Sequence, residues 1–168
     1  MLYHFSEEEE IEIFHPRKHS SFPERLPMVW AIDKERSALY FFPRDCPRIA
    51  YWATSNTTQQ DRQFYFHTTT AKKVIAIEGS WLETIQNTRL YRYSFESEHF
   101  TTMDEGAGYF VSYETQIPVN VEPVGSLLQA LTQEGVELRI MPSLTPLSEE
   151  LLQTSLHFSM IRMRNRKK

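Results

Sequence analysis

Residues 89–124 read RLYRYSFESEHFTTMDEGAGYFVSYETQIPVNVEPV and contain three predicted strands with no predicted helix between them. The strands cover residues 89–95, 108–114 and 118–124, and aromatic side chains at alternate positions of the first strand share one face. Strands joined without a helical crossover pair antiparallel, because a parallel pair needs a long connection. This stretch therefore favours an α+β architecture over regular βαβ alternation.

The rest of the chain alternates irregularly between predicted strands and helices. Apolar runs rich in β-branched and aromatic residues predict strands at 2–5, 28–32, 48–54, 72–79 and 136–140. Capping residues and amphipathic spacing predict helices at 34–42, 80–86, 126–134 and 147–164, with another in 55–70 capped by Thr57 or Thr58. We expect one α+β domain over residues 1–168, with a mixed, mostly antiparallel β core and peripheral helices.

The composition bounds the class of protein. The chain has 168 residues, a net charge of −4 and one cysteine, Cys46. The negative charge argues against bulk nucleic-acid binding, and a lone cysteine suits a reducing compartment. No apolar run reaches the roughly 20 residues that cross a membrane, and Glu7–Glu10 occupy the place of a signal-peptide apolar region. We therefore expect a cytoplasmic protein without membrane contact.

Two common cofactor sites are excluded by spacing. The segment around Gly106 and Gly108 precedes a strand and lacks a third glycine, so neither a Rossmann nor a Walker loop is present. His15 and His19 cannot share a helical face because Pro16 breaks the helix. No metal is therefore expected.

Two further features have a structural and a functional interpretation. Cys46 lies between Arg44 and Arg48, which could lower its pKa, although a lone cysteine is more often a small buried apolar residue. The basic tail, residues 162–168, could hold a phosphate, although cations also suit the end of a helix. The structural interpretation is favoured for both.

Three residues on different predicted strands suit chemistry at a sugar carbon. His4 could hold a ribose hydroxyl, Trp30 could stack on a flat ring, and Glu114 could stabilise an oxocarbenium-like centre. The alternative is that the histidine and the tryptophan belong to the core and the glutamate ends an exposed strand. Spacing alone favours the alternative.

Three blocks of sequence, LYHFSE…IEIFHPR, VWAID…ALYFFPRDCPRI and YFVSYETQIPVNVEPV…ELRIMPSL, resemble a family of small uncharacterised bacterial proteins. The same blocks remotely resemble the ADP-ribosyltransferase-like superfamily. That pattern has a first-strand histidine, which is the H of LYH in this sequence, a second strand leading to a helix, and a late strand with a glutamate before a proline. Trp30 departs from it, because the second motif usually offers Tyr or Ser.

The second resemblance implies a split β core that grips NAD, and an NAD-dependent transferase that moves ADP-ribose to an unidentified acceptor. It implies catalytic roles for His4 and Glu114, and His4 would also bind the cofactor ribose. Trp30 or Tyr3 would stack on the ring, and Arg17 or Arg44 would neutralise the pyrophosphate. Glu7–Glu10 would form a solvated turn beside the site.

Two other classes of function compete with the transferase. The same fold could be a non-catalytic module that binds a nucleotide, another small molecule or a protein. Alternatively, the high aromatic content, 13% of residues, could form a homodimer face.

Overall fold

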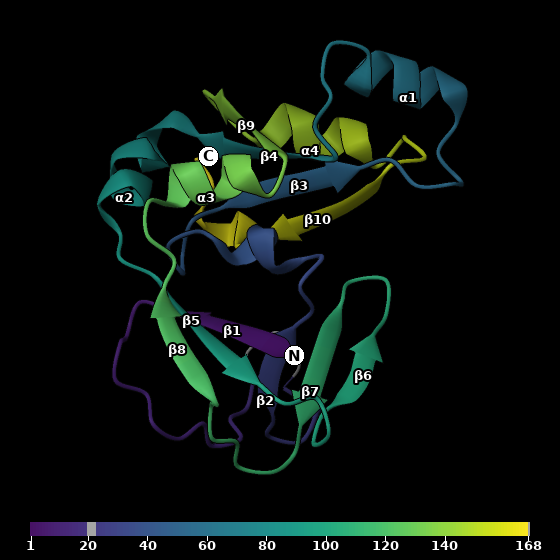
Figure 1. Cartoon of the computed structure of the whole chain (residues 1–168). Coiled ribbons are helices and arrows are strands. Elements are labelled where there is room, and N and C mark those ends of the chain that lie inside the picture. Colours follow the sequence, from purple (N-terminus) through teal and green to yellow (C-terminus); the bar gives the residue numbers. More distant parts are fainter. Residues whose placement is uncertain (20–22, 168) are drawn as a thin grey trace. The chain divides into compact units, whose positions relative to one another are not determined.

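The computed structural model describes residues 1–19 and 23–167, which form a mixed α+β structure with two β-sheets (Figure 1). The chain divides into two compact units. The first unit comprises residues 1–41 and 89–125, and the second comprises residues 42–88 and 126–168. No helix among the described residues is long and apolar enough to cross a membrane.

The first unit contains a six-stranded sheet in the order β6-β7-β2-β1-β5-β8. All of its strand pairs are antiparallel. Its strands are β1 (Leu2–Ser6), β2 (Val29–Ile32), β5 (Tyr91–Phe95), β6 (Thr101–Asp104), β7 (Tyr109–Ser112) and β8 (Asn120–Pro123). A short 3-10 helix, Ser37–Tyr40, follows β2.

One face of this sheet forms the core of the first unit. Because side chains alternate between the faces of a strand, Leu2 on β1 and Val29 and Ala31 on β2 are buried together. Phe14 packs on this face, with its ring 5.1 Å from the rings of Tyr93 and Phe95. Edge-to-face packing of aromatic rings adds to the free energy gained by burying them.

The second unit contains a four-stranded sheet in the order β10-β3-β4-β9. Its strands are β3 (Arg48–Trp52), β4 (Lys73–Glu78), β9 (Val136–Met141) and β10 (His157–Ile161). Its helices are α1 (Gln59–Phe66), α2 (Leu82–Asn87), α3 (Leu127–Gln133) and α4 (Thr145–Leu151), with 3-10 turns at Gly79–Trp81 and Met163–Asn165. β4 and β9 are parallel, and the other pairs in this sheet are antiparallel.

A buried carboxylate joins distant segments of the second unit. Glu78 ends β4 with only 2% of its surface exposed. Its side-chain oxygens accept hydrogen bonds from the backbone N–H of Leu144, at 3.2 Å, and of Lys167, at 2.9 Å. A buried carboxylate needs such donors, because leaving it without them costs several kcal/mol, about the desolvation penalty of the charge.

Most predicted elements occur at the expected places, including the eight predicted strands. Thr58 caps α1 by accepting from the N–H of Asp61 at 3.2 Å. Ser126 caps α3, and Gly135 ends that helix with a φ of +71°. The mixed, mostly antiparallel β core is confirmed.

Two helix predictions need correction, and two strands were missed. The predicted helix at 34–42 is only the 3-10 helix Ser37–Tyr40. The predicted helix at 147–164 is wrong, because α4 ends at Leu151 and β10 follows. Beyond the end of α4, the backbone N–H of Ser155 donates to the Asp61 carboxylate at 2.7 Å, and pairing with β3 imposes a strand from His157. β6 was the second missed strand.

We predict that the whole chain unfolds in one cooperative transition, as the expectation of a single domain requires. Each unit is assembled from two separate segments, so each completes its sheet only when distant parts of the chain are in place. Thermal unfolding followed by far-ultraviolet circular dichroism and by tryptophan fluorescence should give coincident midpoints. Two resolved transitions would contradict the prediction.

Candidate functional site

His4 lies on β1 and is held by a backbone carbonyl. Its Nδ1 lies 3.0 Å from the carbonyl oxygen of Trp30, and since a carbonyl only accepts, Nδ1 carries the proton. The imidazole also contacts the ring of Phe14 edge-on, with 5.0 Å between the ring centroids. His4 is therefore fixed in orientation on the core side of the sheet.

The register of β1 and β2 separates His4 from the two predicted stacking residues. Tyr3 pairs with Ile32, so these two side chains lie on the same face of the sheet. Alternation along each strand adds Trp30 to that face and places His4 on the opposite one. Tyr3 and Trp30 are thus brought to a common face, and His4 is not.

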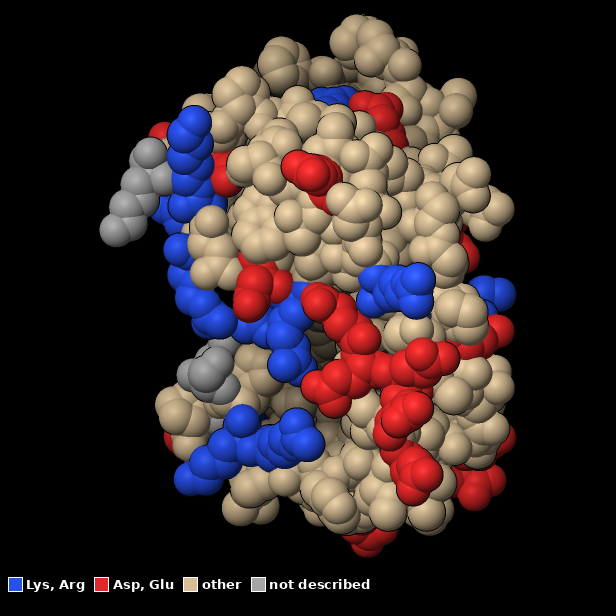
Figure 2. Space-filling model, turned by 90° about the vertical axis from the view of Figure 1, so that its left-hand side faces the viewer, with Lys and Arg blue, Asp and Glu red and all other residues tan. Residues whose placement is uncertain are grey.

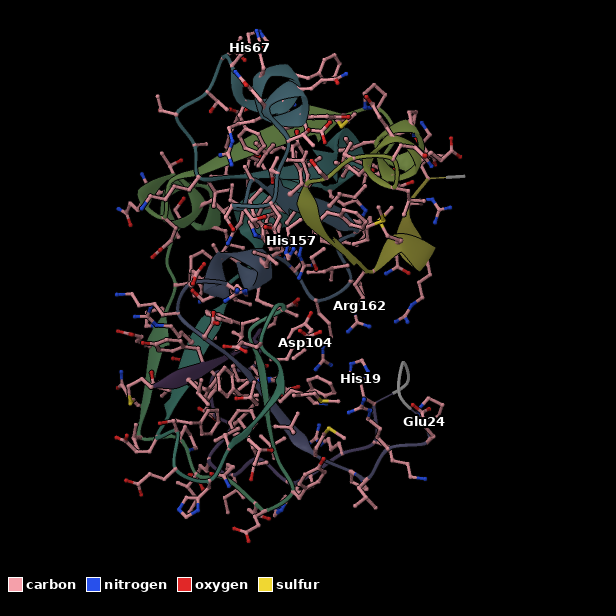
Figure 3. The ribbon with its side chains drawn as sticks, turned by 90° about the vertical axis from the view of Figure 1, so that its right-hand side faces the viewer. His19, Glu24, His67, Asp104, His157 and Arg162 are labelled. Carbon is pink, nitrogen blue, oxygen red and sulfur yellow. The ribbon has the colours of Figure 1, made fainter. Side chains whose placement is uncertain are left out.

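Trp30 belongs to a group of four rings, Trp30, His19, Tyr40 and Tyr109, which we call the aromatic cluster. The indole lies 5.7 Å from the ring of Tyr109 in an edge-to-face arrangement and 5.2 Å from the ring of His19. The hydroxyl of Tyr40 donates to the hydroxyl of Tyr109 at 2.7 Å. Figure 3 labels His19 beside the sheet of the first unit. Each residue of the cluster is partly exposed.

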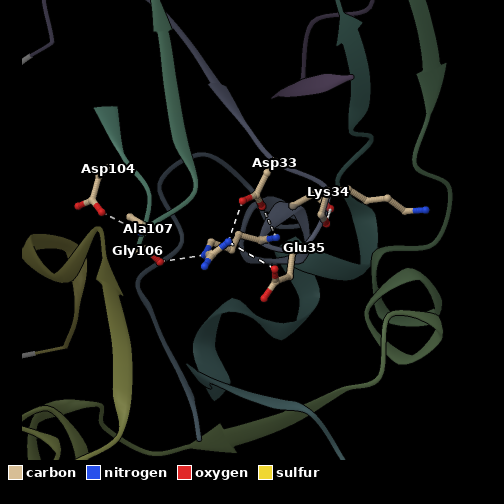
Figure 4. A network of polar contacts seen from close by, with 8 residues as sticks. Asp33, Lys34, Glu35, Asp104, Gly106 and Ala107 are labelled. Carbon is tan, nitrogen blue, oxygen red and sulfur yellow. Dashed lines mark hydrogen bonds and ion pairs between the residues drawn. The ribbon is translucent and has the colours of Figure 1, made fainter. Parts of the chain in front are cut away.

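An ion pair positions the two tyrosines of the cluster. Asp33 accepts from the backbone N–H of Arg36 at 2.8 Å and pairs with its guanidinium at 2.7 Å. Arg36 Nε donates to the carbonyl of Gly106 at 2.9 Å (Figure 4). The Asp33 N–H donates to the carbonyl of Gly108 at 3.1 Å. These bonds connect the 3-10 helix, which carries Tyr40, to the turn before β7. Tyr109 is the first residue of β7.

Glu114 lies just beyond β7 and is exposed. Its backbone N–H donates to the Ser112 hydroxyl at 3.2 Å. Since Ser112 on β7 pairs with Val29, this turn adjoins the start of β2. Glu114 therefore follows β7, His4 lies on β1, and β2 lies between these two strands of the same sheet.

The two predicted phosphate-binding arginines belong to different units. Arg17 exchanges two backbone hydrogen bonds with Met28, at 3.0 and 3.1 Å, and its side chain is exposed. Arg44 is also exposed and lies in the second unit, where its carbonyl accepts from Arg162 Nε at 3.2 Å.

The acidic run Glu7–Glu10 is an ordered, exposed segment. The hydroxyl of Tyr93 donates to the carbonyl of Glu8 at 2.6 Å, and the hydroxyl of Tyr91 donates to the Glu9 carboxylate at 2.9 Å. This second bond raises the pKa of Tyr91. Figure 2 shows acidic side chains gathered in a strip on the surface.

Cys46 and the basic tail have structural contacts. The thiol is fully buried, and desolvation raises its pKa to about 12, so the prediction of a buried, non-nucleophilic cysteine is supported by its environment.

In the tail, Asn165 Nδ2 donates to the carbonyl of Asp45 at 2.7 Å. Arg166 Nε lies 3.4 Å from the hydroxyl of Thr145.

The described residues contain no group of three or more His, Cys, Asp or Glu side chains that could hold a metal ion. An open hollow in the second unit lies along α1, and none of the predicted site residues lines it. Its lining residues are Gln59, Gln60, Gln63, Phe64 and His67.

The ion pair and both tyrosines of the cluster were not among the residues expected from the sequence. The spacing of three residues between Asp33 and Arg36 was the signal for a local ion pair. Tyr109 and Tyr40 meet across 69 residues of sequence, which no local pattern indicates.

With this geometry established, the chain can be placed among known proteins. It belongs to DUF6886, a family of unknown function whose model matches residues 3–166. The expected membership of an uncharacterised family is thus confirmed. No curated protein and no solved structure matches the chain.

We predict that Gly108→Ala destabilises the protein by about 1–3 kcal/mol. Gly108 has a φ of +70°, and an added Cβ would lie 2.5 Å from both Arg36 Cδ and Asp33 Oδ2. Gly106→Ala is the matched control, because its Cβ would meet only Asp104 Oδ1, at 3.3 Å. Urea unfolding of both variants measures the effect, and equal stabilities would contradict it.

Proposed function

We propose that the protein binds a nucleotide of the NAD type on the aromatic cluster. The observation that carries the proposal is Trp30, a partly exposed residue with two further rings within 5.7 Å, on the sheet face opposite the core. Aromatic side chains stack on planar bases, and the Tyr40 and Tyr109 hydroxyls offer polar contacts to a base edge or ribose. The ion pair of Asp33 and Arg36 supports the cluster by holding both tyrosines in place.

The geometry favours binding over catalysis. Nδ1 of His4 already donates to the Trp30 carbonyl, and its ring lies on the face opposite the indole. A catalytic histidine that positioned the ribose would have to reach the same ligand as the stacking ring. A binding module therefore requires no movement of the His4 ring to the face of the indole, whereas a transferase does.

We predict that Trp30→Leu weakens NAD binding about tenfold to a hundredfold, because stacking of a base on an aromatic ring contributes about 1–3 kcal/mol. Isothermal titration calorimetry with NAD, ADP-ribose, AMP and nicotinamide measures the affinity and identifies the part of the ligand that is bound. Trp81→Leu is the matched control, since Trp81 is also partly exposed but lies in the second unit.

Two results would count against this prediction. Equal affinities of the Trp30 and Trp81 variants would remove the aromatic cluster as the site. No heat with any of the four ligands would remove nucleotide binding altogether and leave an interaction protein as the remaining function.

The second candidate function is an NAD-dependent ADP-ribosyltransferase-like transferase. The observation that favours it is the strand order β7-β2-β1, which makes the three segments of the superfamily pattern neighbours in one sheet. In this proposal His4 would hold the nicotinamide-side ribose, and the Glu114 carboxylate would stabilise the oxocarbenium-like transition state. Arg17 would contact the pyrophosphate.

We predict for the transferase that Glu114→Gln lowers nicotinamide release at least about a hundredfold with little change in NAD affinity, because the charge acts on the transition state. His4→Ala should weaken both binding and rate, since its role is to position the ribose. Chromatography of released nicotinamide measures the rate, with Glu12→Gln as a control at another exposed carboxylate of the first unit. A wild-type protein that binds NAD and releases no nicotinamide is a binding module.

A further inference from the structure

Among the residues that the structure describes, the edge strands of the two sheets are β6, β8, β9 and β10, and the longest uninterrupted edge is that of β9. β6 has four residues and an irregular register between Thr102 and Asp104. β8 has four residues and ends on Pro123, which lacks an N–H. β10 has five residues and runs into Arg162, a residue with a left-handed φ of 55°. β9 has six residues with neither a proline nor a register shift.

The outer edge of β9 offers backbone groups to another strand. β9 pairs with β4 along its whole length, from Val136 to Met141, and no strand follows it in the sheet order. In a parallel pair, alternate residues of an edge strand direct their N–H and C=O groups outward. Ile140 on this strand leaves 52% of its surface exposed, which is unusual for a β-branched residue in a sheet.

The sequence of β9, VELRIM, is complementary to itself in the antiparallel direction. When two copies align about Leu138, Glu137 of each faces Arg139 of the other, and Val136 faces Ile140. Opposite charges and apolar pairs directly across two antiparallel strands stabilise the pairing. In this alignment residues 136, 138 and 140 pair only with one another, and so do residues 137 and 139. The alignment is therefore possible whichever of these two sets directs its N–H and C=O groups outward.

The charged pair is already formed within one chain. Arg139 Nε donates to the Glu137 carboxylate at 2.8 Å, and the guanidinium lies 5.7 Å from the ring centroid of Tyr51. Hydrogen bonds from Thr69 and Arg139 lower the pKa of Glu137, so the carboxylate is ionised at neutral pH. In the paired arrangement each of the four charges has an opposite charge beside it and another across from it.

We propose that β9 is the interface of a homodimer, in which two copies pair antiparallel about Leu138 and join their four-stranded sheets into one. A twofold axis makes this interface closed, so the assembly ends at two copies. It also removes the exposed sheet edge, which would otherwise favour aggregation. The proposal concerns the second unit and is independent of the nucleotide site.

The test uses the full chain with charge substitutions on β9. Sedimentation velocity over a micromolar to millimolar series should show wild-type protein as a dimer. Glu137→Arg and Arg139→Glu each place like charges across the axis and should weaken the dimer at least about tenfold. Glu149→Arg is the control, because Glu149 is an exposed glutamate on α4, outside the edge.

Two further samples separate loss of the interface from loss of the fold. The double variant E137R/R139E restores opposite charges across the axis and should regain dimerisation. An equimolar mixture of the two single variants should form a heterodimer, because an all-basic edge then faces an all-acidic one. A monomeric wild-type protein, or single variants as dimeric as the Glu149 control, would overturn the proposal, as would a mixture that stays monomeric although both variants are folded by circular dichroism.

Discussion

The two-residue period of a β-strand is the constraint on which the candidate site depends. Because Tyr3 pairs with Ile32, every other side chain of β1 and β2 is assigned to a face. Leu2 and His4 point to the core, and Tyr3 and Trp30 point the other way. Residues that look like one constellation in the sequence are thereby divided between two environments, and only side chains of the same face can contact one ligand directly.

On the face opposite the core, the ion pair of Asp33 and Arg36 holds the two tyrosines in position, as close packing holds the side chains of the core. Arg36 bonds to Asp33 and to the carbonyl of Gly106, and the ion pair with Asp33 is partly shielded from water. A pair of this kind contributes more than an ion pair in open solvent, because its groups are held by several bonds at once. The Tyr40 and Tyr109 hydroxyls consequently meet at 2.7 Å without help from a continuous helix.

The sequence allowed the strands of both sheets to be located well, because continuous or alternating apolar runs are a local signal. β10 was not predictable in this way, since Met160 and Ile161 fit a helix as well as a strand and only pairing with β3 decides between them. The sequence singled out His4 and Glu114 as candidates, and it could not indicate their faces, because register is a property of two strands. The aromatic cluster was hidden for the same reason, as its rings come from four separate segments.

The contact between Glu78 and Lys167 bears on the order in which the two sheets are completed. The carboxylate is synthesised long before its second donor, the N–H of Lys167, and β10, which closes one side of the sheet, is also synthesised late. The strands of the first sheet all precede residue 124, so this sheet can be completed before β10 is made, whereas the second sheet must wait for that strand. During that interval the open side of β3 is a surface for which a chaperone and a neighbouring nascent chain compete.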